Sequence, residues 1–269
     1  MVSNESALRT AFDRAANTID AIAINNPVNA WMRNECRREL LALYPEKSTL
    51  IEIGCGTGAD AVFLAERGHR IAATDISDRM VERARERIAA ADLGGRVLVF
   101  RGRLDQVASE LERSEWSPFD GAYANFSLAY EDSLRGVARI VHRLVKPSGC
   151  FLFTVPNRLC ISEPAVALFR LRIARLGDRL RDPIQAKIRG MTVAVRAYSP
   201  GQVRRSLRDL FRIEASLGLP VFMPPPALYR PSFEALRANL ESFDNGLARR
   251  LPWRLLGDTT LFKTRKVGW

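Results

Sequence analysis

Residues 50–60 read LIEIGCGTGAD, an apolar run that ends in three closely spaced glycines. The apolar run predicts a buried β-strand, and glycine, which has no Cβ, lets the chain turn tightly and approach a ligand. A helix is expected from Ala59, so its first free N–H groups would face the same turn. The stretch therefore predicts a strand, a turn and a helix that together hold an adenosine-containing cofactor.

The loop alone leaves the identity of that cofactor open. Gly54, Gly56 and Ala59 also satisfy the dinucleotide fingerprint G-x-G-x-x-G/A. Asp75 follows Gly54 by 21 positions, at the end of the second expected strand, where a carboxylate would hold a ribose diol in either case. A dehydrogenase and an enzyme with another adenosine cofactor both fit these residues.

Strands and helices alternate from Thr49 to residue 156, which is typical of a parallel sheet. The expected strands are Thr49–Ile53, Arg70–Thr74, Val97–Phe100, Phe119–Asn125 and Cys150–Val155. The expected helices are Ala59–Arg67, Asp78–Ala91 with Ser77 as its N-cap, Gln106–Arg113 and Ser133–Leu144.

The flanking segments follow a different pattern. Helices at Ser6–Ile22 and Asn29–Leu43, separated by Asn26-Pro27, would form an N-terminal cover. Beyond Pro156 we expect an arginine-rich helical stretch at Glu163–Arg181, a strand at Met191–Tyr198 and a helix starting at Ser199-Pro200. We then expect a strand at Phe211–Leu217 and a stiff Pro224–Pro226 loop. A helix at Phe233–Leu251 and a last strand at Thr259–Thr264 would complete the chain.

Basic residues exceed acidic ones only in the C-terminal part. Residues 161–269 hold 20 Lys or Arg against 9 Asp or Glu, which accounts for the whole net charge of +11. Such a field can attract an anionic small molecule, a nucleic acid or an anionic membrane, or it can be an ordinary solvated surface. The four cysteines form no C-x-x-C pair, and no secretory signal or 18-residue apolar run is present, so we expect a reduced, cytoplasmic protein without a metal site.

Four segments together resemble the class I S-adenosylmethionine-dependent methyltransferases. They are EIGCGTG at 52–58, TDISDRM at 74–80, FDGAYANFS at 119–127 and LVKPSGCFLFTV at 144–155. In that order they are similar to the family's first motif, its D-x-S-x-x-M continuation, its fourth strand and the L-K-P-G-G turn before its fifth strand. A dehydrogenase needs none of the last three.

The resemblance implies S-adenosylmethionine as cofactor and S-adenosylhomocysteine as product. Asp75 would bind the ribose hydroxyls, Ile76 and Met80 would flank the adenine, and Arg33 is a candidate partner of the methionine carboxylate. The other cofactor-binding residues that we expect are Glu52, Gly54, Cys55, Gly56, Gly58, Leu104, Asn125 and Phe126.

Arg103 departs from the family's pattern. Many relatives place an acidic residue at this position, directly after a glycine, to receive the adenine amino group. The backbone of Leu104 or the side chain of Asp105 would have to substitute. The adenine contact therefore stays open.

The family places acceptor chemistry after the fourth strand. Tyr130 would orient or deprotonate the acceptor, Asn125 would bond to the cofactor amine or the substrate, and Glu131 would act as a base unless it begins the next helix. His69 and His142 are not favoured as bases, because the first follows a helix stop and the second lies among apolar residues. Methyl transfer from a sulfonium mainly needs alignment and exclusion of water.

These features predict an α/β fold, a Rossmann-like three-layer sandwich with a mostly parallel sheet ending in an antiparallel strand. We expect one compact domain whose parts are a helical cover (1–48), a cofactor-binding core (49–156), a helical lid insertion (157–190) and the rest of the sheet with substrate-covering loops (191–269). The cap residues would include Phe222, Met223, Leu228 and Tyr229.

The predicted function is methylation of a small molecule, either acidic or partly apolar. The alternative is a tRNA or rRNA methyltransferase that uses the basic C-terminal half, against which the missing N/D-P-P-Y/F tetrad argues weakly. A cofactor-binding scaffold without enzymatic activity and a peripheral membrane contact are further hypotheses. No obligate protein partner is indicated.

Overall fold

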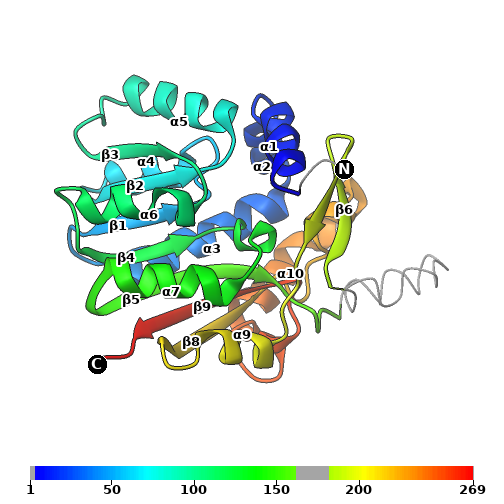
Figure 1. Cartoon of the computed structure of the whole chain (residues 1–269). Coiled ribbons are helices and arrows are strands. Elements are labelled where there is room, and N and C mark those ends of the chain that lie inside the picture. Colours follow the sequence, from blue (N-terminus) through cyan, green and yellow to red (C-terminus); the bar gives the residue numbers. More distant parts are fainter. Residues whose placement is uncertain (1–3, 162–181, 269) are drawn as a thin grey trace.

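A seven-stranded sheet organises the chain in the computed structural model, which describes residues 4–161 and 182–268 (Figure 1). Its strands, in sheet order, are β3 (Val97–Arg101), β2 (Arg70–Asp75), β1 (Thr49–Ile53), β4 (Phe119–Ala124), β5 (Val145–Pro156), β9 (Thr259–Lys266) and β8 (Phe211–Leu219). Strands β1 to β5 are parallel, whereas β9 is antiparallel to both β5 and β8. The predicted α/β fold, with one antiparallel strand at the end of the chain, is confirmed.

Helices cover both faces of this sheet and give it two apolar cores. One face carries α3 (Pro27–Leu43), α4 (Ala59–Ala65) and α5 (Asp78–Ala90), and the other carries α6 (Leu104–Arg113), α7 (Leu134–Leu144) and α9 (Pro200–Leu207). A strand covered on both faces needs apolar side chains in both directions. Leu50 and Ile51, neighbours in β1, accordingly belong to opposite cores and are both fully buried.

The strand order reverses between β1 and β4. The chain proceeds outward from β1 through β2 to β3, and then returns to place β4 and β5 on the other side of β1. In open α/β sheets, ligands bind in the crevice outside the carboxyl ends of the strands at this reversal. The glycine loop that follows β1 lies at that point.

The N-terminal cover differs from the single helix predicted at Ser6–Ile22. It consists of α1 (Asn4–Ala15) and α2 (Ile19–Asn25), separated by a turn in which the Thr18 N–H bonds to the Ala15 carbonyl at 2.9 Å. Asn17 in this turn accepts hydrogen bonds from Arg83 on α5, so the break between the two helices lies at a tertiary contact. The predicted one-helix segment was wrong at this point.

The predicted break at Asn26-Pro27 is confirmed. The Asn26 side chain accepts hydrogen bonds from the N–H groups of Val28 and Asn29, and Pro27 is the first residue of α3. Proline suits this position because its missing N–H would be unpaired in any helix.

A separate hairpin, β6 (Ile184–Ile188) and β7 (Met191–Val195), lies beside α1 (Figure 1). The strand predicted at Met191–Tyr198 forms over part of that range, but it pairs within this two-stranded sheet and not with the main one. Val193 on the hairpin is fully buried against Leu8 on α1. The helical stretch predicted at 163–181 lies outside the described residues.

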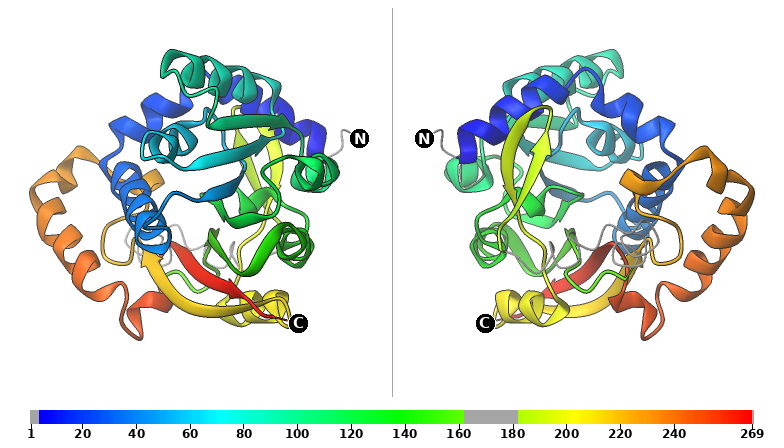
Figure 2. Two further views of the ribbon diagram at one scale, coloured as in Figure 1. Left: turned by 90° about the vertical axis from the view of Figure 1, so that its left-hand side faces the viewer. Right: turned by 90° about the vertical axis from the view of Figure 1, so that its right-hand side faces the viewer.

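The C-terminal segment returns to the sheet as predicted, with a helix before the last strand. This helix, α10 (Glu234–Leu247), lies on the outer side of α3 (Figure 2) and ends before the predicted Leu251. Its Asp244 accepts hydrogen bonds from three successive backbone N–H groups of the loop after β8, at 2.7 to 3.0 Å. No helix in the described part of the chain is long and apolar enough to cross a bilayer.

Candidate functional site

The glycine loop, residues 54–58, opens at the carboxyl end of β1. Gly54 and Gly56 have φ angles of +72° and +54°, a region that residues with a Cβ rarely adopt. A Cβ at Gly54 would lie 2.4 Å from the Cβ of Ser127, so only glycine fits there. At Gly56 nothing lies within 4 Å of the corresponding position. The loop therefore packs tightly at its start and faces open space at its centre.

A cavity of about 280 Å³ lies above this loop. Pockets for drug-sized ligands begin at about 300 Å³, so the cavity has the size of a single small ligand. Eleven of the twelve predicted cofactor residues line it: Arg33, Glu52, Gly54, Cys55, Gly56, Asp75, Ile76, Met80, Leu104, Asn125 and Phe126. Segments 100 residues apart thus converge on one site.

Gly58 is the predicted cofactor residue that does not line the cavity. It starts α4, and a Cβ there would lie 3.1 Å from the Cβ of Ala84 on α5. Its small size therefore serves helix packing. Cys55 does line the cavity, and burial raises the pKa of its thiol well above the usual value, so the thiol stays protonated and neutral.

Asp75 ends β2 and fixes the glycine loop from below. Its two carboxylate oxygens accept hydrogen bonds from the N–H groups of Gly56 at 2.8 Å and Ser77 at 2.9 Å. Each carboxylate oxygen has a second lone pair, so both can still accept from ligand hydroxyls. Burial raises the pKa of Asp75 although these backbone hydrogen bonds oppose the shift.

Two buried acceptor atoms in the cavity lining have no hydrogen-bond partner. They are Oε2 of Glu52 and Oδ1 of Asn125, while the Asn125 amide donates to Asp60 at 3.1 Å. Burial raises the pKa of Glu52 well above its usual value, with the negative charge of Asp60 adding to the effect. Unpaired buried acceptors cost free energy, so this end of the cavity is suited to a ligand that donates hydrogen bonds.

Arg33 and Arg37, one helical turn apart on α3, have different surroundings. Arg37 donates to the Asp60 carboxylate at 2.7 Å and to the Ala59 carbonyl at 3.0 Å, which fixes the start of α4. Arg33 lines the cavity and forms no ion pair within the described residues. Its cation is therefore available to an anionic ligand group. No set of three His, Cys, Asp or Glu in these residues is placed to hold a metal ion.

Tyr130 and Glu131, the predicted acceptor-side residues, both line the cavity. Tyr130 packs edge-on against Phe12 of α1, with ring centroids 5.0 Å apart. Burial raises the pKa of Tyr130, so its hydroxyl stays protonated at neutral pH and is suited to donating a hydrogen bond. The structure does not favour Tyr130 as a base.

Glu131 does not begin the following helix. Ser133 caps α7, and Glu131 instead accepts a hydrogen bond from Arg103 at 2.6 Å. Arg103 has 10% of its side chain exposed and lines the cavity, pointing across it from the β3 side to the β4 side. Burial raises the pKa of Glu131, and Arg103 opposes that shift. Arg103, which departs from the family's sequence pattern, is therefore paired with Glu131 in the structure.

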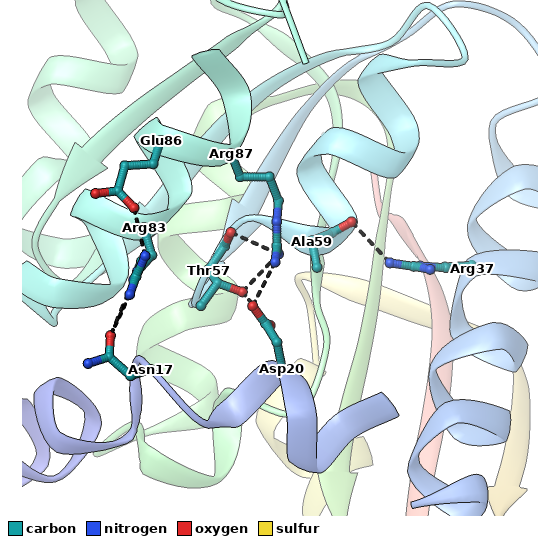
Figure 3. Close-up of polar contacts among 8 residues, drawn as sticks. All are labelled: Asn17, Asp20, Arg37, Thr57, Ala59, Arg83, Glu86 and Arg87. Atoms are coloured by element: carbon teal, nitrogen blue, oxygen red, sulfur yellow. Dashed lines mark hydrogen bonds and ion pairs between the residues drawn. The ribbon is translucent and has the colours of Figure 1, made fainter. Parts of the chain in front are cut away.

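The N-terminal cover is tied to the glycine loop by residues that the sequence did not single out (Figure 3). Asp20 of α2 accepts hydrogen bonds from the Thr57 hydroxyl at 2.7 Å and from Arg87 of α5 at 2.6 Å. Arg87 also donates to the carbonyl and hydroxyl oxygens of Thr57 at 3.1 and 3.0 Å. Asp20 and Arg87 are 67 residues apart, so no local motif could reveal the pair.

A second set of contacts attaches α1 to α5. Asp13 accepts from the Ser77 hydroxyl at 2.6 Å and from the Arg79 N–H at 3.1 Å. Leu8 and Phe12 of α1 and Ile19 of α2 then close the cavity from above. The cover predicted at the N-terminus thus forms one wall of the site.

The residues predicted to cap the site from the C-terminal part lie elsewhere. None of the described residues of 182–268 lines the cavity. Phe222, Met223 and Tyr229 pack against the core on the α3 face, and Phe222 contacts Trp253 with ring centroids 5.0 Å apart. Asp244 holds their loop against α10, so these side chains do not line the cavity, and their covering of the substrate stays a prediction.

The basic residues of the C-terminal part form a separate groove beside β8. This groove of about 640 Å³ contains five arginines and one acidic side chain: Arg204, Arg205, Arg208, Arg212, Arg254 and Glu214. None of these residues lines the cavity above the glycine loop. Within the described residues, the positive charge of the C-terminal part therefore does not reach the lining of the candidate site.

Residues 28–209 match a family described as a methyltransferase domain. Among curated proteins, 170 residues are 29% identical to the malonyl-[acyl-carrier protein] O-methyltransferase of Pectobacterium atrosepticum, covering 62% of this chain and 60% of that enzyme. In a separate match, 112 residues of the chain are 28% identical to the tRNA 5-carboxymethoxyuridine methyltransferase of Escherichia coli, covering 42% of this chain and 41% of that enzyme. The chain spans about half the length of these relatives.

Solved structures agree in fold. The 1,6-didemethyltoxoflavin-N1-methyltransferase of Burkholderia thailandensis superposes with a TM-score of 0.62 at 16% identity, covering 100% of this chain and 92% of that one. The N-methyltransferase NodS of Bradyrhizobium japonicum has a TM-score of 0.59 at 15% identity, covering 99% and 100%. At these identities the similarity establishes the fold alone.

Proposed function

The chain belongs to the class I S-adenosylmethionine-dependent methyltransferases, and from this premise we propose that it transfers a methyl group from S-adenosylmethionine to a small, partly apolar acceptor. The observation that carries the proposal is that one cavity contains hydrogen-bond acceptors without a donor and a cation without a paired anion. Within the part of the chain that the structure describes, Oε2 of Glu52 and Oδ1 of Asn125 lack donors, and Arg33 lacks an anion. An amino-acid group, with its ammonium and carboxylate, satisfies all three.

The remaining lining suits the rest of the cofactor. Asp75 retains free lone pairs for the ribose hydroxyls, and the glycine loop leaves room above Gly56. Ile76, Met80 and Leu104 supply apolar surface for a flat base. The donor set therefore fits S-adenosylmethionine from one end of the cavity to the other.

Positioning and exclusion of water are the catalytic tasks that this site can perform. Bound S-adenosylmethionine supplies a methyl group on a sulfonium, which needs no covalent help from the protein. Leu8 and Phe12 shield the cavity from above, and the Tyr130 hydroxyl is placed to donate a hydrogen bond to the acceptor. Asn125 acts as a positioning residue through its free oxygen.

The cover over the cavity supports a small acceptor. Relatives whose names give an acceptor include enzymes for malonyl groups on a carrier protein and for 1,6-didemethyltoxoflavin, both small reacting groups. The N-terminal cover lies directly over the cavity, so a large acceptor would have to displace it. These observations favour a small molecule.

Isothermal titration with S-adenosylhomocysteine and NAD tests the proposal. The wild-type protein should bind S-adenosylhomocysteine and not NAD, and Asp75→Asn should weaken that binding by about 10- to 100-fold, because charged hydrogen bonds contribute about 1.5–3 kcal/mol. Asp78→Asn is the matched control, since Asp78 lies three residues away and outside the cavity lining. Binding of NAD alone would identify the chain as a dehydrogenase.

A second candidate function, methylation of RNA, is favoured by one observation, the arginine groove beside β8. Phosphates pair well with guanidinium groups, and each neutralised phosphate of a single strand contributes a slope of about −0.7 to the salt dependence of binding. If the groove binds RNA, substituting Arg204, Arg205 and Arg212 by Ala should reduce the slope for unfractionated tRNA by about 2. Arg79, Arg83 and Arg85 on α5 provide a triple control. Absence of tRNA binding at low salt removes this candidate.

A further inference from the structure

The mouth of the cavity, where the turn Leu128–Tyr130 faces α1, contains more acidic than basic side chains. Glu131 lies in the lining, and the charges of Asp105, Asp132 and Glu5, which lie outside the lining, all act on it. Among the described residues, Arg103 is the one cation that does. Glu5 also lies 3.6 Å from Arg9 on the same helix. The balance at the mouth is therefore negative even when Arg9 is included.

Arg103 is already occupied by carboxylates. Its Nη2 lies 2.6 Å from Glu131 and 3.1 Å from Asp132, and its Nε lies 3.7 Å from Asp105. Only 10% of its side chain is exposed. One guanidinium shared by three carboxylates leaves a net negative charge, so an anionic acceptor would be repelled and would have to displace Glu131 to reach Arg103.

Aromatic rings provide a second, independent feature of the same region. Phe12, Phe126 and Tyr130 line the cavity, and Phe12 and Tyr130 are in edge-to-face contact. The face of an aromatic ring attracts cations, most strongly where water is excluded. Aromatic rings beside carboxylates form a combination suited to an ammonium group.

We propose that the methyl acceptor is an amine that is cationic in solution and attached to an apolar body, recognised by Glu131 and the rings of Phe12 and Tyr130, while the exposed Asp132 adds negative charge outside the lining. This inference rests on the proposed methyltransferase function and names the substrate class of the same site. It replaces the acidic acceptor that the net charge suggested, because five of the C-terminal arginines line the groove beside β8 and none of the described residues of 182–268 lines the cavity.

N-methylation of such an acceptor balances without a further reactant. The ammonium first loses one proton to Glu131 or to solvent, which frees the nitrogen lone pair. The N–C bond forms as the S–C bond of the methyl donor breaks, and the electron pair of that bond leaves with sulfur. The methylated nitrogen then carries the positive charge that the sulfonium carried before.

The inference is tested by calorimetric titration of protein that is saturated with S-adenosylhomocysteine. The two probes, phenethylamine and 3-phenylpropionate, are similar in size and opposite in charge. The amine should bind about tenfold more tightly than the acid, and this preference should decrease as salt rises from 0.02 to 0.5 M (about 20 to 4 Å in Debye length). Glu131→Gln and Asp132→Asn should each weaken binding of the amine several-fold. Asp78→Asn, outside the cavity, should leave it unchanged.

The variant Arg103→Gln distinguishes a cationic acceptor from an anionic one. With an amine acceptor this variant should retain or strengthen amine binding, whereas with an anionic acceptor it should abolish binding of the acid. Tighter binding of 3-phenylpropionate, or binding of neither probe, overturns the inference. Because S-adenosylhomocysteine binding is measured first, its loss counts against the proposed function, and its presence without a preference for the amine counts against this inference alone.

Discussion

Arg33 shows how a single side chain acquires a function from its neighbours. Arg37 and Arg38 on the same helix are paired with Asp60 and Glu35, so their cations are already compensated. Arg33 points into the cavity and is not paired among the described residues. A ligand carboxylate would give this half-buried guanidinium a charge-assisted hydrogen-bond partner.

Arg33→Gln should weaken binding of S-adenosylhomocysteine by about tenfold, because it removes a charge-assisted hydrogen bond worth about 1.5 kcal/mol or more. 5′-Methylthioadenosine, which lacks the amino-acid part, should bind the variant and the wild type equally. Titration of both ligands checks this, with Arg38→Gln as the control on the same helix. Equal loss for both ligands would mean that Arg33 only stabilises the fold.

At the scale of elements, α2 depends on polar contacts. None of its residues is buried, and Ile22 and Ile24 are 50% and 74% exposed, so apolar packing contributes little to holding it in place. Its attachment to the glycine loop runs through Asp20, which bonds to Thr57 and Arg87 (Figure 3). The cofactor loop and the cover above it are thereby coupled.

Asp20→Asn should increase the dissociation rate of S-adenosylhomocysteine about 3- to 10-fold, the effect of losing about 0.6–1.4 kcal/mol from a partly buried ion pair. Stopped-flow displacement measures this rate. A double-mutant cycle with Arg87→Gln should show coupling, because both residues act through the same contact. Asn17→Ala, which breaks the neighbouring contact to Arg83 but leaves Thr57 untouched, should change the rate little. An unaltered dissociation rate in Asp20→Asn would show that the contact of α2 with the glycine loop does not hold the ligand in the cavity.

For the whole molecule, buried carboxylates determine how stability depends on pH. Burial raises the folded-state pKa of Glu52 well above its usual value, and burial also raises that of Asp75. A raised carboxyl pKa favours the protonated form in the folded state. The corresponding stability is therefore present below the unfolded pKa and is lost as pH rises toward the folded pKa.

Glu52→Gln should accordingly be more stable than the wild type at pH 7.5, with a melting temperature higher by about 2–4 °C per kcal/mol gained. The difference should shrink as pH falls toward 4.5, the ordinary glutamate pKa, where the folded-state carboxyl is protonated and half of the unfolded-state carboxyls are protonated as well. Thermal unfolding of the ligand-free protein across this range measures it, and the exposed Glu46→Gln is the control. A constant difference across the range would contradict the role of the buried charge.

Local sequence determined the strands, the turns and most of the site. The apolar runs Leu50–Ile53 and Phe151–Phe153 are strands because both faces of each are covered, and the glycines after β1 have the positive φ angles that this residue tolerates. Glu52, the glycine loop, Asp75 and Asn125 lie at or just after the carboxyl ends of neighbouring parallel strands, so strand order brings them together, whereas Arg33 and Met80 reach the cavity from helices α3 and α5. Gly58 was the exception, because α5 packs against it.

Tertiary structure alone decided what covers the cavity and where the charges lie. The Asp20–Arg87 contact joins residues 67 positions apart, and the expected cap residues Phe222 and Met223 are held against α10 by Asp244. Five of the C-terminal arginines line a groove beside β8, while carboxylates surround Arg103 at the cavity mouth. Local propensity fixes which element forms, but the direction that a charged side chain faces depends on packing between distant elements, which net charge along a sequence does not record.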